Sequence, residues 1–484
     1  MSEKQAPRLP AGRESSMLST ISQSLSFYSS PHLFLTSRQD DPDNPPENSV
    51  PLAVRARILN RDIAVIVSYT HCKEILDIQQ LSSLPRSAES AIVAAHAGQT
   101  VTPTSFGVLP AYKELMVDFF PHPNLLLSDA PSHKPRREAW DEHMAKVNAK
   151  SSTLLREIVE EEVSTWPAGG DFDLYDHMKD MTWRLLVAVF LELKPEDSHY
   201  HDVVKWQEEL LRGQFSLFPV SIKSPFWRSP RSRGLEARRK LQEALRRRVD
   251  AIGPQCPFHC QDSKVPQEEL ASNLLLFTSS IAVKAVASLL TASLLNLYLF
   301  PSETSLIQRV RDLENSEDRE ILMRSILLET ERLSPPVIGL MRRMQQDIVL
   351  QRPGEVETPG TLVPSGWDAW LYFFGANRNE HIYTDAHRFV AERFIGQGTP
   401  PSLTFGFGDK ECLGKDMVRQ IVQIVATVLV DSGIDLRGSV ESEGVRGWLG
   451  WDVGVSLESI ERDLKQLPCQ RPRKPIKLYV SRSC

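Results

Sequence analysis

The chain has 484 residues, of which 41% are hydrophobic and 24% charged, and its formal net charge at pH 7 is -6. This composition is typical of globular proteins, and the length permits about two to four domains of ordinary size. The acidic balance argues against a nucleic-acid-binding protein, because such proteins usually show a basic excess. The six cysteines are too sparse for a disulfide framework. We therefore expect a reducing, cytoplasmic location.

The first fifty residues are mostly polar, and the stretch from 39 to 51 is rich in Asp, Asn and Pro. The first 25 residues contain no apolar run of signal-peptide length. We expect a flexible tail and linker over residues 1–50, no N-terminal transmembrane anchor, and one domain over residues 51–484.

Hydrophobic periodicity predicts a mostly helical domain with short strands. The helical segments are 71–80, 136–192 with a break near 167–170, 205–213, 234–252, 273–300, 303–333 and 413–430, and the strands fall in 54–68 and 337–373. Residues 81–125, 224–233, 253–266 and 377–404 are expected to be irregular. Long irregular segments inside a compact domain are often functional.

The apolar segment 273–300 is long enough to cross a bilayer. However, Thr278, Ser279, Ser280 and Lys284 lie within it, and a lysine in the middle of a membrane is costly. The segment is therefore predicted to be a buried central helix rather than a transmembrane span.

The strongest signal is a glycine-rich loop in which Phe405, Gly408, Cys412 and Gly414 fit the pattern Phe-x-x-Gly-x-x-x-Cys-x-Gly. Chance produces this match in about one of a thousand chains of this length. Glycines allow a sharp turn and a close approach of the backbone to a ligand. The apolar helix that follows would favour a thiolate at Cys412 through its positive end. A core cysteine in a glycine turn is the less frequent alternative.

The motif resembles the haem-binding loop of the cytochromes P450. The resemblance implies that Cys412 is the axial thiolate of haem b and that Phe405 shields its sulfur, with Gly408 and Gly414 close to the cofactor. A thiolate ligand pushes electron density onto iron and favours O–O cleavage. Lys410 stands where the family usually has Arg or His. It still offers a cation to a haem propionate, although not a bidentate one.

Other segments are similar to the family in the right order over roughly residues 50 to 480. The pair Glu329 and Arg332 on a predicted helix, with Arg393 further on, resembles a buried triad that is structural rather than catalytic. Alone, such an i,i+3 ion pair is common on solvated helices.

The segment 129–137 is similar to the start of a long family helix that contacts haem propionates. The resemblance assigns this role to His133 and Arg137, and also to Arg342, ten residues after Arg332. Taken singly, each of these residues is as frequently a solvated surface charge as a propionate contact. Together with Lys410 they form a more specific set.

The pattern departs from the family in the central helix. Ile281 and Ala282 occupy the positions of an acid and an alcohol that supply protons during dioxygen activation. Ser279 or Ser280 could hold a water instead, a substrate hydroxyl could act, or the enzyme could use peroxide or rearrange its substrate. Lys284 could share the same face, but a snorkelling or paired lysine is the more frequent case.

Two weaker sequence signals each have a simpler structural interpretation beside the functional one. Cys256 and Cys260 lack the second pair of ligands that a zinc site needs, so a loop is expected. The segment 215–233 mixes aromatic and basic residues, which suits either an anionic membrane surface or a packed lid with a solvated rim; these residues are Phe218, Phe226, Trp227, Lys223, Arg228, Arg231 and Arg233.

The resemblance therefore implies a mostly α fold with small β-sheets, in which a triangular helical domain encloses haem between the helix near 270–299 and the cysteine loop. It implies an oxidoreductase, a monooxygenase of a small apolar organic molecule, similar to P450s of natural-product pathways. Dioxygen or peroxide would be the oxidant and a separate NADPH-dependent reductase the electron donor. The alternatives are a P450-fold enzyme that rearranges, cyclises or dehydrates its substrate, and a non-catalytic haem-binding protein.

Overall fold

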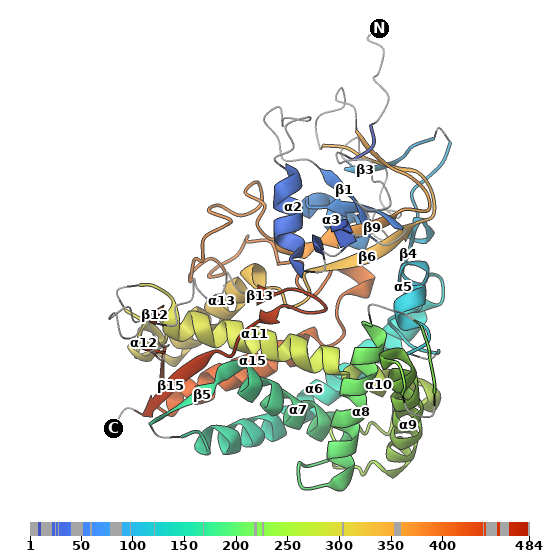
Figure 1. Cartoon of the computed structure of the whole chain (residues 1–484). Coiled ribbons are helices and arrows are strands. Elements are labelled where there is room, and N and C mark those ends of the chain that lie inside the picture. Colours follow the sequence, from blue (N-terminus) through green and yellow to red (C-terminus); the bar gives the residue numbers. More distant parts are fainter. Residues whose placement is uncertain are drawn as a thin grey trace.

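The computed structural model of the chain describes residues 8–10, 22–39 and 52–482, apart from 59–60, 78–89, 217–219, 225–226, 353–359, 442–452, 455–463 and a few single positions. It is mostly helical with small sheets, which confirms the predicted fold class. In Figure 1, helix α11 crosses the middle of the molecule, with the largest sheet above it and α6, α7 and α8 below it.

The helices form most of the domain. They are α2 Pro31–Gln39, α3 Tyr69–Leu76, α5 Val108–Met116, α6 His133–Ser164, α7 Leu174–Leu191, α8 Ser198–Gln214, α9 Pro230–Ala251, α10 Gln267–Phe277, α11 Ser280–Leu299, α12 Leu306–Arg311, α13 Ser316–Leu333, α14 Phe373–Ala376 and α15 Lys415–Asp431, with the short 3-10 helices η1 Pro103–Ser105 and η2 Gly408–Lys410. Helices α6, α7, α11, α13 and α15 contribute much of the largest hydrophobic core.

The strands form five small sheets. The largest has the order β1 Ala53–Ile58, β2 Arg61–Ile66, β9 Asp368–Tyr372, β6 Gly339–Met344 and β4 Phe106–Gly107, and only its β2–β9 pair is parallel. The three-stranded sheets have the orders β10 Ile434–Gly438, β15 Lys477–Arg482, β5 Gly170–Asp173, and β3 Ile92–Ala94, β7 Ile348–Leu350, β8 Thr361–Val363. The remaining pairs are β11 Val440–Glu441 with β12 Val453–Gly454, and β13 Leu464–Lys465 with β14 Arg471–Pro472.

The central apolar segment is buried, as predicted, but it is not one continuous helix. Helix α10 ends at Phe277 and α11 begins at Ser280. The Thr278 hydroxyl donates to the Leu274 carbonyl at 2.7 Å, and the Ser279 hydroxyl accepts from Ala282 N–H at 3.2 Å as the N-cap of α11. Serine and threonine hydroxyls compete in this way with the helical ladder. Helix α11 is long and apolar enough to span a membrane, but 72% of its apolar window is buried inside the protein.

Two further segments differ from the sequence-based expectation. Within the expected tail, α2 packs Phe34 and Leu35, which are 4% and 2% exposed, into a small core with the first sheet. Most of the predicted linker lies outside the described residues. The segment 81–125, expected to be irregular, contains α5, η1 and two short strands. The C-terminal strands β10 to β15 were not predicted, because several are only two residues long.

Helices α8 and α9 cross at a pair of glycines. A Cβ atom on Gly234 would lie 2.8 Å from Cα of Gly213, closer than two carbon atoms can approach. The absence of side chains therefore allows direct backbone contact between the helices. This contact fixes α8, whose inner face reaches the break between α10 and α11.

Candidate functional site

The cysteine loop turns through two glycines with left-handed backbone conformation. Gly406 has φ of 76° and Gly408 has φ of 67°, a region that other residues rarely adopt. A Cβ on Gly408 would also lie 2.8 Å from the Leu76 carbonyl oxygen. Across this turn, Cys412 N–H donates to the Phe405 carbonyl at 2.7 Å. Gly414 is the N-cap of α15 and has φ of −88°. A positive φ therefore does not explain why glycine occupies this position.

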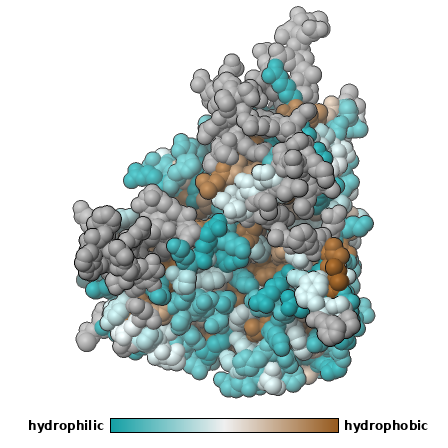
Figure 2. Space-filling view, viewed as in Figure 1, coloured by the Kyte–Doolittle hydropathy of each residue, from teal (hydrophilic) through white to brown (hydrophobic). Residues whose placement is uncertain are grey.

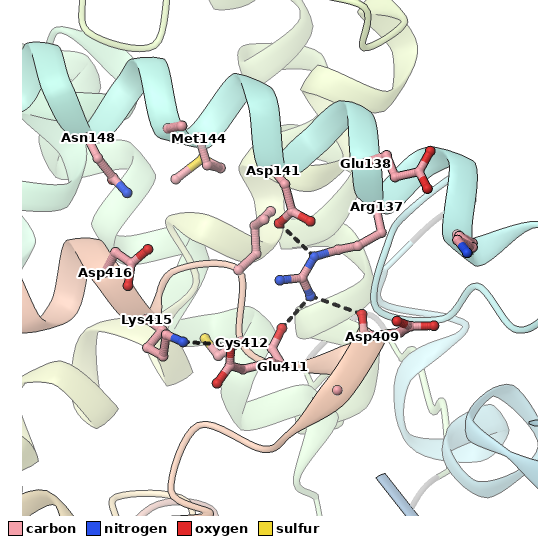
Figure 3. Close-up of a pocket in the computed structure, with 14 residues that line it drawn as sticks. Arg137, Glu138, Asp141, Met144, Asn148, Asp409, Glu411, Cys412, Lys415 and Asp416 are labelled. Carbon is pink, nitrogen blue, oxygen red and sulfur yellow. Dashed lines mark hydrogen bonds and ion pairs between the residues drawn. The ribbon is translucent and has the colours of Figure 1, made fainter. Parts of the chain in front are cut away.

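The Cys412 side chain lines a half-open pocket of about 480 Å³. Its surface is accessible, although burial among protein atoms raises the pKa of its thiol, against a smaller lowering effect of the Gly414 backbone N–H. The pocket lies between α6 and the cysteine loop, and Figure 3 shows the residues that each of these two elements contributes to it. A sulfur surrounded by protein yet accessible from a pocket suits a ligand to a bound metal, which would deprotonate it.

A cluster of basic side chains lies beside this loop. His133, Arg137, Arg342 and Lys410 come from α6, β6 and η2, and each of the last three lowers the pKa of His133 by its charge. Burial is the largest cause of that shift and the pKa of His133 falls to about 3. Burial, together with the Arg342 and Arg137 charges, lowers the pKa of Lys410 to about 8, while Asp129 opposes this shift.

The cluster has more positive charge than its surroundings neutralise. The Lys410 ammonium lies 3.6 Å from the Asp129 carboxylate and also donates to the Ser128 carbonyl. Arg342 is 5% exposed and donates to the Met341 carbonyl at 2.9 Å. Among the described residues, no hydrogen-bond partner is found for the buried Nδ1 atom of His133. Buried polar atoms rarely lack a partner, so this group of side chains suits an anionic ligand.

Arg137 joins the cluster to the cysteine loop. Its guanidinium donates to the carbonyl oxygens of Asp409, at 3.2 Å, and Glu411, and it is paired with Asp141 at 2.8 Å (Figure 3). These contacts hold the loop against α6.

The structure joins Glu329, Arg332 and Arg393 in one buried network. The Glu329 oxygens lie 2.7 and 2.8 Å from Arg332 nitrogens and 3.0 and 3.1 Å from Nε of Arg393. Glu329 and Arg332 are fully buried, and Arg332 also donates to the carbonyls of Asn377 and Ala386 at 2.7 Å each. The network connects α13 to the segment before the cysteine loop.

A second pair beside this network was missed by the sequence analysis. Glu331, two residues after Glu329, accepts from Arg419 of α15 at 2.8 and 2.9 Å and from the Ser402 hydroxyl at 2.7 Å. The Arg419 guanidinium also lies 5.5 Å from the centre of the Phe405 ring. Glu329 could be recognised from the arginine three residues after it, whereas Glu331 and Arg419 lie 88 residues apart and no local pattern connects them.

The serines of the central segment lie at the helix break. Ser279 is engaged as the N-cap, and Ser280 donates to Glu208 of α8 at 2.8 Å. Lys284 is also paired with Glu208, at 2.8 Å, which agrees with the plain alternative of a paired lysine. Ile281 and Ala282 present no polar side chain in this region. The Cys256–Cys260 loop forms no metal cluster among the described residues.

Comparison with known proteins gives one consistent family. A family model for cytochrome P450 matches residues 307–432, which include the buried triad and Cys412. The putative cytochrome P450 120 of Synechocystis sp. is 28% identical over 301 residues, 56% of this chain and 64% of that protein. Abscisic acid 8'-hydroxylase of Solanum lycopersicum is 22% identical over 57% of this chain and 60% of that protein. The chain belongs to the cytochrome P450 family.

Solved P450 structures share the whole fold. The retinoic acid-bound cyanobacterial CYP120A1 aligns with a TM-score of 0.68 and 18% identity over 99% of this chain and 100% of that chain. Cytochrome P450EX alpha with myristic acid aligns with a TM-score of 0.65 and 16% identity over 98% and 99%. At such low sequence identities, the structural similarity establishes only that the fold is shared. The sequence alignments span 60 to 64% of the length of the first curated relatives.

P450s bind haem b through a cysteine thiolate, and this P450 has residues that fit the cofactor. Cys412 lines a pocket and can supply the thiolate. The cations of Arg137, Arg342 and Lys410, with the unpartnered Nδ1 of His133, suit the two propionates. These residues are the ones that would hold haem in this chain.

The triad gives a direct stability prediction. Glu329→Gln leaves two arginines without their carboxylate in a buried site, so the free energy of unfolding should fall by about 3–5 kcal/mol. Chemical denaturation monitored by circular dichroism measures the change. The matched control is Glu392→Gln, which breaks an exposed pair with Arg309 and should cost less than about 1 kcal/mol. Equal losses in the two variants would contradict a special role for the buried network.

Proposed function

We propose that this P450 is a monooxygenase that oxidises a small, fairly apolar organic molecule, with dioxygen as oxidant and a separate NADPH-dependent reductase as electron donor. The observation that carries the proposal is the accessible sulfur of Cys412 in a glycine-rich turn, beside the cations of Arg137, Arg342 and Lys410. The names of the similar proteins mention abscisic acid, ent-kaurenoic acid and retinoic acid. These are small acids with largely hydrocarbon skeletons, which supports a substrate of this class, of the kind made in secondary metabolism.

Each part of the chain has a separate task in this proposal. Bound haem supplies the chemistry of dioxygen activation. Cys412 would hold the haem iron as its thiolate ligand and donate electron density to it, and its position beside the α15 N-terminus favours the thiolate form. The Phe405 ring screens the sulfur from water. Gly408 permits the turn that brings the sulfur forward, and Arg137 holds the loop against α6.

Proton supply is the step in which this chain differs from its family, because Ile281 and Ala282 replace the acid and the alcohol. General acid–base catalysis typically contributes about 100- to 10,000-fold to a rate. This observation favours a second candidate, a P450-fold enzyme that uses peroxide or that rearranges, cyclises or dehydrates its substrate. A non-catalytic haem-binding protein is the third candidate.

Turnover under defined conditions separates the three candidates. A screen of apolar acids and terpenoids should find compounds that shift the ferric Soret band, and these should be hydroxylated in the presence of reductase, NADPH and dioxygen. Products from peroxide alone, or without any oxidant, would favour the second candidate. Tight binding without conversion under any condition would favour the third.

The variant Ile281→Asp/Ala282→Thr provides a control within the same assay. If it leaves NADPH-driven turnover unaltered, the missing pair does not limit the rate.

We further propose that the segment between α8 and α9 contacts an anionic membrane surface. Its apolar side chains Val220, Ile222 and Trp227 are 55%, 49% and 55% exposed. Lys223 and Arg228, which are also exposed, form a β-bridge beside them. An apolar tip flanked by cations suits the interface of acidic lipids. Phe218 and Phe226 lie outside the described residues, and the face shown in Figure 2 is otherwise largely hydrophilic.

Vesicle sedimentation tests the membrane contact. The protein should bind vesicles that contain phosphatidylserine more tightly than pure phosphatidylcholine vesicles, and salt should weaken binding because each cation near the surface contributes about 1 kcal/mol. Trp227→Ser should reduce binding, whereas Ile321→Ser, which changes a similarly exposed residue on α13, should not. Binding that ignores lipid charge, or equal effects of the two variants, would contradict the proposal.

A further inference from the structure

Two adjacent residues of α8 bind the two sides of the break in the central helix. The Gln207 Nε2 atom donates to the Leu275 carbonyl at 3.3 Å and to the Thr278 hydroxyl at 3.1 Å, at the end of α10. The Glu208 carboxylate accepts from the Ser280 hydroxyl at 2.8 Å, at the start of α11. Helix α8 therefore satisfies polar groups that the interrupted helix leaves without partners.

The Glu208 carboxylate connects the solvent side of the protein with its interior. One oxygen accepts from the Lys284 ammonium at 2.8 Å, and the other accepts from Ser280. The side chains of Glu208 and Lys284 are 26% and 17% exposed, whereas Ser280 is 1% exposed. A continuous hydrogen-bonded path thus leads from partly solvated charges to a buried hydroxyl.

This buried hydroxyl directly precedes the two positions at which the chain departs from its family. Ile281 and Ala282 can neither donate nor accept a proton, and among the described residues Glu208 is the acid that hydrogen-bonds the start of α11. We infer that Glu208 supplies from α8 the carboxylate that the family places on the central helix, and that it relays protons from solvent to Ser280. The inference rests on the proposed monooxygenase function.

The relay conserves atoms and charge. Glu208 takes up one proton from solvent, and rotation of the carboxyl group turns the protonated oxygen toward Ser280. The Ser280 hydroxyl, which donates to the carboxylate form of Glu208, turns its own proton toward the interior and releases it as Oγ accepts the Glu208 proton. Reverse rotation of both groups restores the starting hydrogen bonds, so the net result is the inward movement of one proton. Lys284 acts as a positioning residue that holds the carboxylate.

A second buried atom marks where the path can continue. Gln207 is fully buried, and within the described part of the chain its Oε1 atom has no hydrogen-bond partner. Buried acceptors of this kind usually bind an ordered water. Because the Nε2 atom of the same amide contacts Thr278, such a water would lie beside the helix break.

Burial and the groups around Glu208 together determine the pKa of its carboxyl. Burial works to raise its pKa, but the hydrogen bond and charge of Lys284, with the Ser280 hydrogen bond and the Arg212 charge, hold the pKa below its usual 4.5. Lys179 and Tyr175 of α7 and Cys469 also face this carboxylate. The lowered pKa favours the carboxylate form, so Glu208 would pass a proton on rather than store it.

The variant Glu208→Gln tests the relay, because glutamine keeps the size of the side chain but cannot pass on an acidic proton. Turnover driven by reductase, NADPH and dioxygen should fall by about 100-fold, with a larger solvent isotope effect. Turnover supported by hydrogen peroxide should change less than twofold, because peroxide supplies both oxygen atoms with their protons. The thermal unfolding midpoint and the substrate-induced Soret shift should stay close to those of the wild type.

Two further variants make the result specific. Glu209→Gln removes the same charge from the neighbouring position, where Glu209 pairs with Arg212 and Arg233, and should leave dioxygen turnover unchanged. Lys284→Met removes the cation that lowers the pKa of Glu208, so the limb of the pH profile due to this carboxyl should move to higher pH.

Several results would overturn the relay. Parallel losses of dioxygen and peroxide turnover in Glu208→Gln, together with a lower unfolding midpoint, would mean that Glu208 only holds α8 in place. An unchanged rate with dioxygen would equally exclude it. If the wild-type protein itself turns over with neither oxidant, the proposed monooxygenase function fails first, and the relay fails with it.

Discussion

One buried carboxylate joins the two halves of the haem-side core. Glu329 on α13 contacts Arg332 of the same helix and Arg393 of the long segment that leads to the cysteine loop. Arg332 in turn donates to three carbonyl oxygens of that segment. A buried ion network stabilises a structure only when every charge has its partners, and here every charge does. The position of Cys412 relative to α13 and α15 depends on this network, which Glu331 and Arg419 extend toward Phe405.

The basic side chains around His133, beside the cysteine loop, are in contrast not fully neutralised by neighbouring carboxylates. Around His133, the cations of Arg137, Arg342 and Lys410 are accompanied by the carboxylates of Asp129 and Asp141 only, and burial and the neighbouring positive charges lower the pKa values of His133 and Lys410. A protein that keeps such a cluster gains from binding an anion there. One side of the haem site is thus internally neutralised and rigid, and the other is left for a cofactor that brings its own negative charges. This contrast fits a region that is held together by its own ion pairs on one side and would bind a negatively charged cofactor on the other.

Much of this site could be predicted from sequence because its signals are local. The spacing within residues 405–414 and within the Glu329–Arg332 turn reflects geometry over a few residues, which a single sequence displays. The helix break at Thr278 and Ser279 could not be predicted from hydrophobic periodicity, since it depends on hydroxyl groups that compete for backbone partners. Glu208 was missed because it lies 72 residues before Ser280 and no local pattern connects them. Helix α2 was hidden by the polar composition of its flanks.

The central claim is the bond between Cys412 and haem iron, and the absorption spectrum of the reduced carbon monoxide complex tests it most directly. The account predicts the red-shifted Soret band of thiolate ligation in the wild type and in Cys260→Ala, and its loss in Cys412→Ala. A protein that stays colourless after haem supplementation, or a Cys412→Ala variant with the wild-type spectrum, would contradict the account.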